Sequence, residues 1–228
     1  MARAFQLVAL AVALAAATFG QQNSSSATTP AKPVYFGKAI GKATVDNTPS
    51  YTTINLYKDE TVSTNMGTHL HVISRGNTLI FSPDSKFQAW VNAFELNEGG
   101  SKVASYTGMT AYLPSCFAVT PVNPTQMTLF EVDWSNGTAY VYARSQDVKI
   151  HYWADHYPKP NEQQKPPNKG WTVKQGDVAR IPNVQACEPL VYFVPPSQWP
   201  TIIEASAASA AGPIGYYLTN QSLSPTHP

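Results

Sequence analysis

The sequence is poor in charge and in long apolar runs. Charged residues make up 13% of its 228 residues, and fifteen basic side chains against fourteen acidic ones leave a formal net charge of +1. Without a basic excess, the chain has no electrostatic footprint for nucleic acid or for an anionic membrane. After the N-terminus, no apolar run has the length that spans a bilayer as a helix. We therefore expect no nucleic-acid partner and no membrane span.

Cysteine is also scarce, since only Cys116 and Cys187 are present. The N-terminus has the layout of a secretory signal peptide, with Arg3 before a short apolar run and small residues up to Gly20. An isolated cysteine pair in an oxidising compartment is most simply a disulfide. We therefore expect a signal peptide over 1–20, secretion to the extracellular space, and a structural bridge between the two cysteines.

What the chain does have is the composition of a β protein, with 12 tyrosines and 19 prolines among many threonines and valines. After a flexible Ser/Thr/Pro-rich stalk over 21–33, the sequence predicts an all-β domain over 34–200. Its short strand-like segments suit an antiparallel β-sandwich, a jelly roll or a barrel. Residues 201–228 are expected to be a C-terminal extension, in which residues 201–211 form either one short helix or a disordered tail of small residues.

Turn signals divide the domain into strands. Residues 87–96 and 103–113 are expected to be separate strands joined by the turn 97–101, which contains two glycines. Residues 157–170 are expected to form a loop outside the sheets, because prolines lack the amide donor that a sheet requires. The other expected strands are 51–57, 68–74, 78–81, 148–153, 171–182 and 189–195.

The stretch 130–144 predicts a β-hairpin around Asn136-Gly137, since a type I′ turn needs positive φ at both central residues. Register then sorts the side chains onto two faces. The face expected in the core carries Phe130, Val132, Trp134, Ala139, Val141 and Ala143. The outward face carries Glu131, Asp133, Tyr140 and Tyr142. Asn136 also begins a sequon, as do Asn23 and Asn220, and all three are candidate N-glycosylation sites.

The outward face of the hairpin is the predicted binding surface. Tyrosines beside acids combine apolar ring faces with hydrogen-bonding groups, which suits an extracellular glycan or protein ligand. Three aromatic residues of nearby segments are candidates to extend it: Tyr152, Trp153 and Tyr157. The two acids on this face also allow a different hypothesis, a hydrolase built on Glu131 and Asp133. Such an enzyme requires the two acids to lie in a cleft, with the pKa of one of them raised.

Histidines offer a different chemistry. His69 and His71 lie two apart in an expected strand and so share a face, where both imidazoles can reach one zinc, copper or iron ion. Further ligands would come from His151, Asp155 or His156. This constellation predicts a metal-dependent enzyme as the alternative function.

Two short segments resemble the conserved segments of the cupins. Residues 176–182, GDVARIP, are similar to their second segment, and the His69-Leu70-His71 pair is similar to the histidine pair of the first. The resemblance implies a small β-barrel with a metal site, although Cys187 stands where the later histidine would fall. The leading hypothesis remains a secreted, disulfide-bonded glycoprotein that binds or supports other molecules outside the cell, is not an enzyme and needs no cofactor.

Overall fold

The computed structural model describes residues 32–50, 52–159 and 162–195. The chain divides into two units, residues 1–31 and 32–228, and every described residue belongs to the second. The expected signal peptide, nearly all of the stalk, the C-terminal helix and two of the sequons, Asn23 and Asn220, therefore lie outside the described residues. No helix in the described ranges is long and apolar enough to cross a membrane.

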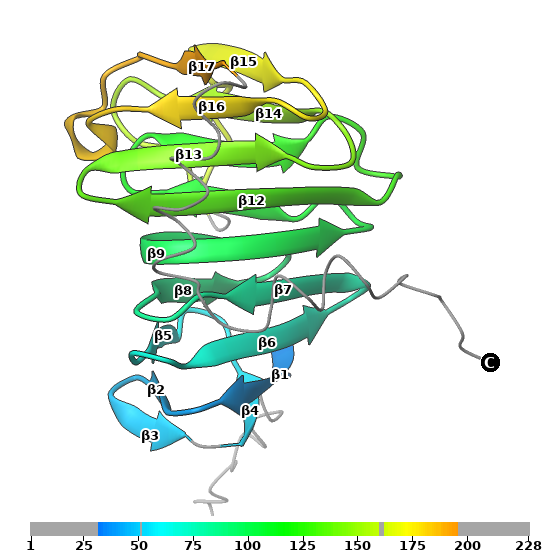
Figure 1. Ribbon diagram of the computed structural model, residues 1–228, viewed down its shortest axis with the longest axis vertical. Coiled ribbons are helices and arrows are strands. Elements are labelled where there is room, and N and C mark those ends of the chain that lie inside the picture. The colour runs from blue at the N-terminus through cyan, green and yellow to red at the C-terminus, as the bar shows by residue number, and fades with distance from the viewer. Residues whose placement is uncertain (1–31, 51, 160–161, 196–228) are drawn as a thin grey trace, which may run out of the picture. The chain divides into compact units, whose positions relative to one another are not determined.

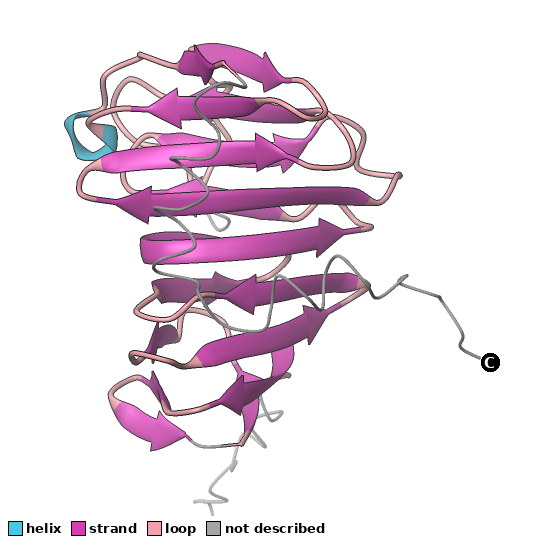
Figure 2. Cartoon of the chain, viewed as in Figure 1, coloured by secondary structure: helices cyan, strands magenta, loops and turns pink. Residues whose placement is uncertain are grey.

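The described part of the chain is almost entirely β-structure, as the sequence predicts. Its one helical segment is a short 3-10 helix, η1 (Val184–Ala186), drawn in cyan in Figure 2. The strands form two sheets that pack as an open sandwich and share strand β9 (Ala93–Ser105). The pairing of β9 with β10 is parallel and all the other pairings are antiparallel.

The first sheet faces the viewer in Figure 1. In spatial order it contains β4 (Thr53–Leu56), β1 (Tyr35–Ile40), β6 (His69–Ser74), β7 (Asn77–Phe81), β9, β12 (Thr128–Ser135), β13 (Thr138–Ala143), β16 (Val178–Ile181) and β17 (Tyr192–Val194). The second sheet contains β3 (Thr48–Ser50), β2 (Ala43–Val45), β5 (Thr61–Thr64), β8 (Lys86–Trp90), β9, β10 (Thr110–Leu113), β11 (Phe117–Pro121), β14 (Val148–Tyr152) and β15 (Lys169–Val173).

Strand β9 crosses from one sheet to the other, and it corrects the expected turn at 97–101. Residues 93–98 pair with β8 and β10 of the second sheet, whereas residues 99–105 pair with β7 and β12 of the first. Gly99 makes the crossing sterically feasible: its φ is +81°, and a Cβ there would lie 2.4 Å from the Ser85 hydroxyl oxygen. The glycines thus redirect a continuous strand, and the actual turn is at Asn92, where φ is 56°.

The core lies between the sheets and is built from the inward-facing residues of both. Its centre is an aromatic cluster beside the crossing strand. Phe81 of the first sheet stacks on Phe87 of the second, with ring centroids 3.6 Å apart, and Phe94 of β9 meets Phe81 edge-on at 5.2 Å. All three side chains are fully buried. This cluster is a direct contact between the two layers.

The hairpin formed by β12 and β13 has the predicted register. All six predicted pairs are present, from Ser135 opposite Thr138 to Phe130 opposite Ala143. Asn136 and Gly137 have φ of 51° and 76°, as a type I′ turn requires, and Asn136 is exposed. The predicted core face is buried. Strict alternation and a well-marked turn were sufficient here because both act within one short segment.

The predicted disulfide is confirmed. Cys116 and Cys187 are bonded, with Cα atoms 5.5 Å apart. Cys116 directly precedes β11 of the second sheet, and Cys187 follows η1, after β16 of the first sheet. The Tyr152 hydroxyl donates a hydrogen bond to the Cys187 carbonyl at 2.9 Å, so the bridge is also held from the second sheet.

Candidate functional site

The histidines proposed as metal ligands lie on different sheets. His69 and His71 are on the outer face of β6 in the first sheet, opposite Ile40 and Lys38 of β1. His151 is on β14 in the second sheet, where its Nε2 atom lies 2.9 Å from the Thr120 hydroxyl. The core separates the two positions, so the three imidazoles do not converge.

The remaining candidate ligands do not complete a site. Asp155 and His156 follow β14 in a loop, and the His156 ring contacts the Tyr157 carbonyl. Within the described residues, no three histidine, cysteine or acidic side chains are placed to hold one metal ion. Burial lowers the pKa of both His69 and His71, which favours neutral imidazoles at physiological pH. The metal-dependent alternative is therefore not favoured by the arrangement of these side chains.

The outward face of the hairpin is engaged in contacts of its own. The Glu131 carboxylate lies 3.1 Å from the Arg144 Nε and 3.8 Å from the Lys102 ammonium. The Arg144 guanidinium in turn lies over the Tyr142 ring at 5.1 Å. Tyr142 is buried against Val178, and Tyr140 packs beside them. Much of the predicted binding surface is therefore already engaged in ion pairs and ring contacts within the protein.

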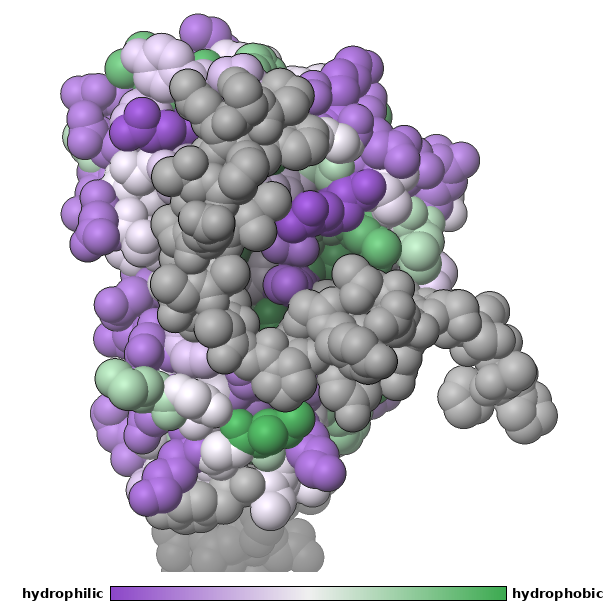
Figure 3. All heavy atoms as spheres, in the orientation of Figure 1, coloured by the Kyte–Doolittle hydropathy of each residue, from purple (hydrophilic) through white to green (hydrophobic). Residues whose placement is uncertain are grey.

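The same outer face carries exposed apolar side chains further along the sheet. Phe36 and Ile73 are paired across β1 and β6 and are about half exposed, and Ile40 is 62% exposed. Figure 3 views this side of the molecule and shows scattered hydrophobic patches among hydrophilic residues. The outer face of the first sheet therefore carries apolar, charged and aromatic side chains together, without one predominant type.

Asp133 differs from Glu131 in having a raised pKa and in lining a hollow. Burial, with a smaller contribution from the neighbouring Glu131 carboxylate, raises the pKa of Asp133 to about 6. Asp133 lines a hollow, as the hydrolase hypothesis requires of its acid, but Glu131 is not among the residues that line it. The two acids are therefore not placed together in a cleft.

The raised pKa makes a prediction for stability. The pKa of Asp133 is higher in the folded state than in the unfolded state, so ionisation of Asp133 lowers the free energy of unfolding. This loss is absent below about pH 4 and grows as the pH rises to about 6. One pKa unit corresponds to about 1.4 kcal/mol, so after allowance for solvent screening we expect Asp133→Asn to stabilise the protein by about 1 to 3 kcal/mol at pH 7.5. Urea unfolding across this pH range measures the effect.

Asp147 is the matched control for this prediction. Its pKa is lowered, first by a hydrogen bond from Lys174 and then by the Gln175 amide, so its ionised form is favoured in the folded state. Asp147→Asn should therefore lose stability at neutral pH, opposite in sign to Asp133→Asn. Equal stability of Asp133→Asn and the wild type at pH 7.5 would contradict the burial argument.

Two of the aromatic residues predicted to extend the binding surface are in packed clusters. Tyr152 faces the core from β14, and Tyr157 is fully buried against Trp90 and Tyr112 on the outer side of the second sheet. Trp153 packs beside this cluster, and its indole N–H donates to the Lys165 carbonyl at 3.0 Å. The proline-rich segment after β14 is thereby held to the second sheet through aromatic contacts.

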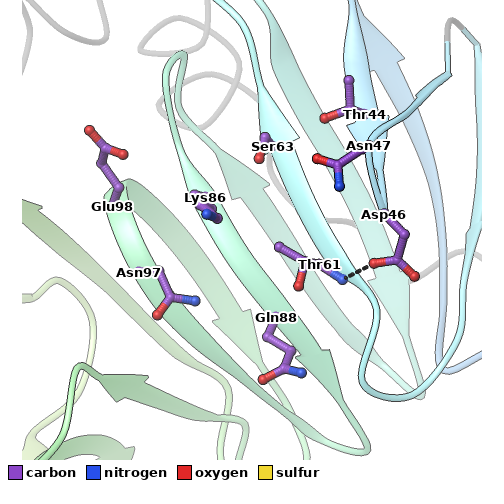
Figure 4. Close-up of a pocket in the computed structure, with 9 residues that line it drawn as sticks. All are labelled: Thr44, Asp46, Asn47, Thr61, Ser63, Lys86, Gln88, Asn97 and Glu98. Atoms are coloured by element: carbon purple, nitrogen blue, oxygen red, sulfur yellow. Dashed lines mark hydrogen bonds between the residues drawn. The ribbon is translucent and has the colours of Figure 1, made fainter.

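A polar groove lies next to this cluster, on the outer face of the second sheet (Figure 4). Its volume is about 800 Å³. Strands β2, β5, β8 and β9 and the turn after β2 supply its lining, which contains hydroxyl, amide, carboxylate and ammonium groups and no hydrocarbon side chain. The lining residues are Thr44, Asp46, Asn47, Thr61, Ser63, Lys86, Gln88, Asn97 and Glu98.

Sheet register arranges these side chains in rows. One row crosses four strands, from Thr44 through Ser63 and Lys86 to Glu98. Because neighbouring strands are about 4.8 Å apart, this row is about 14 Å long. A second row passes from Thr61 to Gln88, then leaves the groove through Glu95 to Tyr112. The second row ends at Tyr112, beside the buried aromatic cluster.

The polar groups in the groove are largely free of protein partners. Asp46 accepts a hydrogen bond from the Thr61 amide at 2.8 Å, and Gln88 donates one to the Asp59 carbonyl at 2.9 Å. None of the ion pairs among the described residues lies in the groove, so Lys86 and Glu98 are unpaired although they are opposite one another. Hydroxyls, amides and single charges therefore remain available to a ligand.

Sequence reasoning did not identify this groove. Alternating polar residues in 61–64 and 86–90 indicate wet strand faces, and Asp46-Asn47 is a turn signal, with both residues at positive φ in the structure. None of these signals shows that the segments are neighbours. Their proximity depends on a strand order, β2-β5-β8-β9, that no local pattern encodes.

Comparisons with known proteins add little. No family model matches the sequence, and no curated protein matches it. Two crystal structures of a candidate anti-sigma factor from Parabacteroides distasonis ATCC 8503 are similar to part of the chain, each with a TM-score of 0.43 and with sequence identities of 14% and 13%. The match covers 63% of this chain and 63% or 64% of theirs, which is less than two thirds of either. Likeness at this level carries no functional argument.

Proposed function

We propose that the domain is an extracellular binding module that holds a neutral glycan chain in the polar groove of the second sheet. The observation that carries this proposal is the lining of the groove, in which all nine side chains are polar. Sugar hydroxyls both donate and accept hydrogen bonds, and threonine, serine, asparagine and glutamine match them in both roles.

Other ligand classes fit the lining less well. Pockets for drug-like molecules are lined mainly by apolar and aromatic side chains. The centres of protein interfaces are enriched in aromatic residues and depleted of charge. The groove has no aromatic side chain, and its charges are Asp46, Glu98 and Lys86. An acidic polysaccharide would meet two carboxylates and one ammonium group, so the charge balance favours a neutral chain.

The extracellular setting is supported by the leader-like N-terminus and by the disulfide, which persists in oxidising compartments. The module needs no bound metal or cofactor for the binding proposed.

Binding to a small panel of polysaccharides tests the proposal. A soluble β-glucan and a galactomannan serve as neutral probes and pectate as the acidic one, with affinity electrophoresis and calorimetry as readouts. We expect binding to a neutral probe and none to pectate. Two hydrogen bonds of about 0.7 kcal/mol each are worth a factor of about ten in affinity, so the Thr44→Ala, Gln88→Ala double variant should bind about tenfold more weakly.

A double variant outside the groove controls for general effects. Thr53 and Gln175 are exposed residues of the same types that lie elsewhere on the domain, and Thr53→Ala, Gln175→Ala should bind as the wild type does. Failure of both neutral probes to bind, or equal loss of affinity in the two double variants, would remove the basis of the proposal.

A further inference from the structure

A second hollow adjoins the polar groove. Its volume is about 500 Å³, and it lies at the tip of the β12–β13 hairpin. Asn97 and Glu98 line both hollows. The lining of the second hollow also includes Gly99, where β9 changes sheets, and Trp134, Asn136 and Gln185 from the hairpin and η1. The two hollows are therefore contiguous through one short piece of β9.

A β-bulge explains why two consecutive residues serve both hollows. In β8, Lys86 lies opposite Glu98 whereas Phe87 lies opposite Leu96, so Asn97 is an extra residue in β9. A bulge interrupts the alternation of side chains and bends the strand. Asn97 and Glu98 consequently both reach the outer side, immediately before Gly99, where β9 leaves the second sheet.

The second hollow adds exposed amide groups to the polar groups of the first. Trp134 is the one aromatic side chain in its lining, but it packs in the core and is only 9% exposed, so most of its ring is closed to a ligand. Asn136 and Gln185 add exposed amides from the hairpin turn and from η1. Amide groups donate and accept hydrogen bonds, so these two side chains match sugar hydroxyls in both roles. The polar rows of the first hollow and the exposed amides of the second would contact different parts of one extended ligand.

We propose that the two hollows form one continuous groove for a single glycan chain, with the hairpin tip as a second subsite. This inference rests on the proposed function of the first hollow and specifies its ligand as a polymer longer than one hollow accommodates. Asn97 and Glu98 would contact the middle of the chain. Affinity should then depend on ligand length.

Oligosaccharides of defined length test the inference. Disaccharides, tetrasaccharides and octasaccharides of both neutral probes are titrated into the full chain, produced without N-glycosylation because a glycan on Asn136 would occupy the second subsite. We expect affinity to rise about tenfold or more from the tetrasaccharide to the octasaccharide in the wild type. The Asn136→Gly, Gln185→Ala double variant should lose this rise, since each amide lost removes about one hydrogen bond.

The substitutions are chosen so that the variant should keep its fold. Glycine supports the positive φ that the turn requires at position 136, so the hairpin should form in the variant, and its thermal midpoint verifies this. Gln175→Ala is the matched control and should keep the full length dependence. Affinity that is flat beyond the tetrasaccharide, or an octasaccharide that binds the tip variant as well as the wild type, overturns the second subsite while the dependence on Thr44 and Gln88 stands. Absence of binding at every length overturns both proposals.

Discussion

Replacing Cys116 and Cys187 together by alanine is expected to lower the free energy of unfolding by about 4 kcal/mol. The two cysteines are 71 positions apart, and on the chain-entropy model a loop of this length removes about that much stability when it is opened. Small domains are stable by about 5 to 15 kcal/mol, so the loss is a large part of the total. Urea unfolding of the purified double variant measures it.

The bridge joins the segment before β11 to the segment after η1, so its loss also frees the two sheets from a covalent connection. Wild-type protein unfolded in the presence of a reductant should match the double variant, because both remove the same constraint. A difference of less than about 1 kcal/mol between variant and wild type would show that non-covalent packing alone fixes this end of the sandwich.

The second large effect is expected at the aromatic contact between the sheets. Phe81→Ala should cost about 3 to 5 kcal/mol, since it removes a fully buried ring and leaves a cavity. The lost contacts are the stack on Phe87 and the edge-on contact with Phe94. Phe81→Leu should cost less, because it retains most of the apolar volume. Thermal and urea unfolding of both variants provide the ranking.

An exposed phenylalanine provides the comparison. Phe193 lies on the edge strand β17 and is 51% exposed, so Phe193→Ala should change stability by no more than about 0.5 kcal/mol. If Phe81→Ala is no more destabilising than Phe193→Ala, the aromatic cluster does not hold the sheets together in the way described.

The hairpin and the crossing strand show what local sequence could and could not predict. Asn136-Gly137 allows one turn type, and alternation on both sides fixes the register, so that hairpin was predictable residue by residue. Gly99 and its neighbour Gly100 are compatible with either a turn or a redirected strand. The choice depends on partners that are distant in sequence: the Ser85 hydroxyl forms hydrogen bonds with the Gly100 backbone, and Asp133 lies opposite Gly100 in the pairing of β9 with β12.

The same limit applies to the candidate sites. The spacing of His69 and His71 correctly places both on one strand face, but it says nothing of the sheet on which His151 lies. The polar groove could not be predicted from the sequence, because its residues come from separate segments. Thr44, Ser63, Lys86 and Glu98 are unremarkable within their own segments, and only the strand order makes them a row.

The position of β9 has a mechanical consequence. Each sheet receives four strands from the chain before β9 and four from the chain after it, so β9 is the one strand held by hydrogen bonds in both layers. A force that separates the strands sideways would load the hydrogen bonds of an edge pair a few at a time and peel that pair away. A force that slides one layer along the other would instead load β9 along its length, where its hydrogen bonds on both sides resist together. The sandwich should therefore yield readily to peeling at its ends and resist shear at its centre.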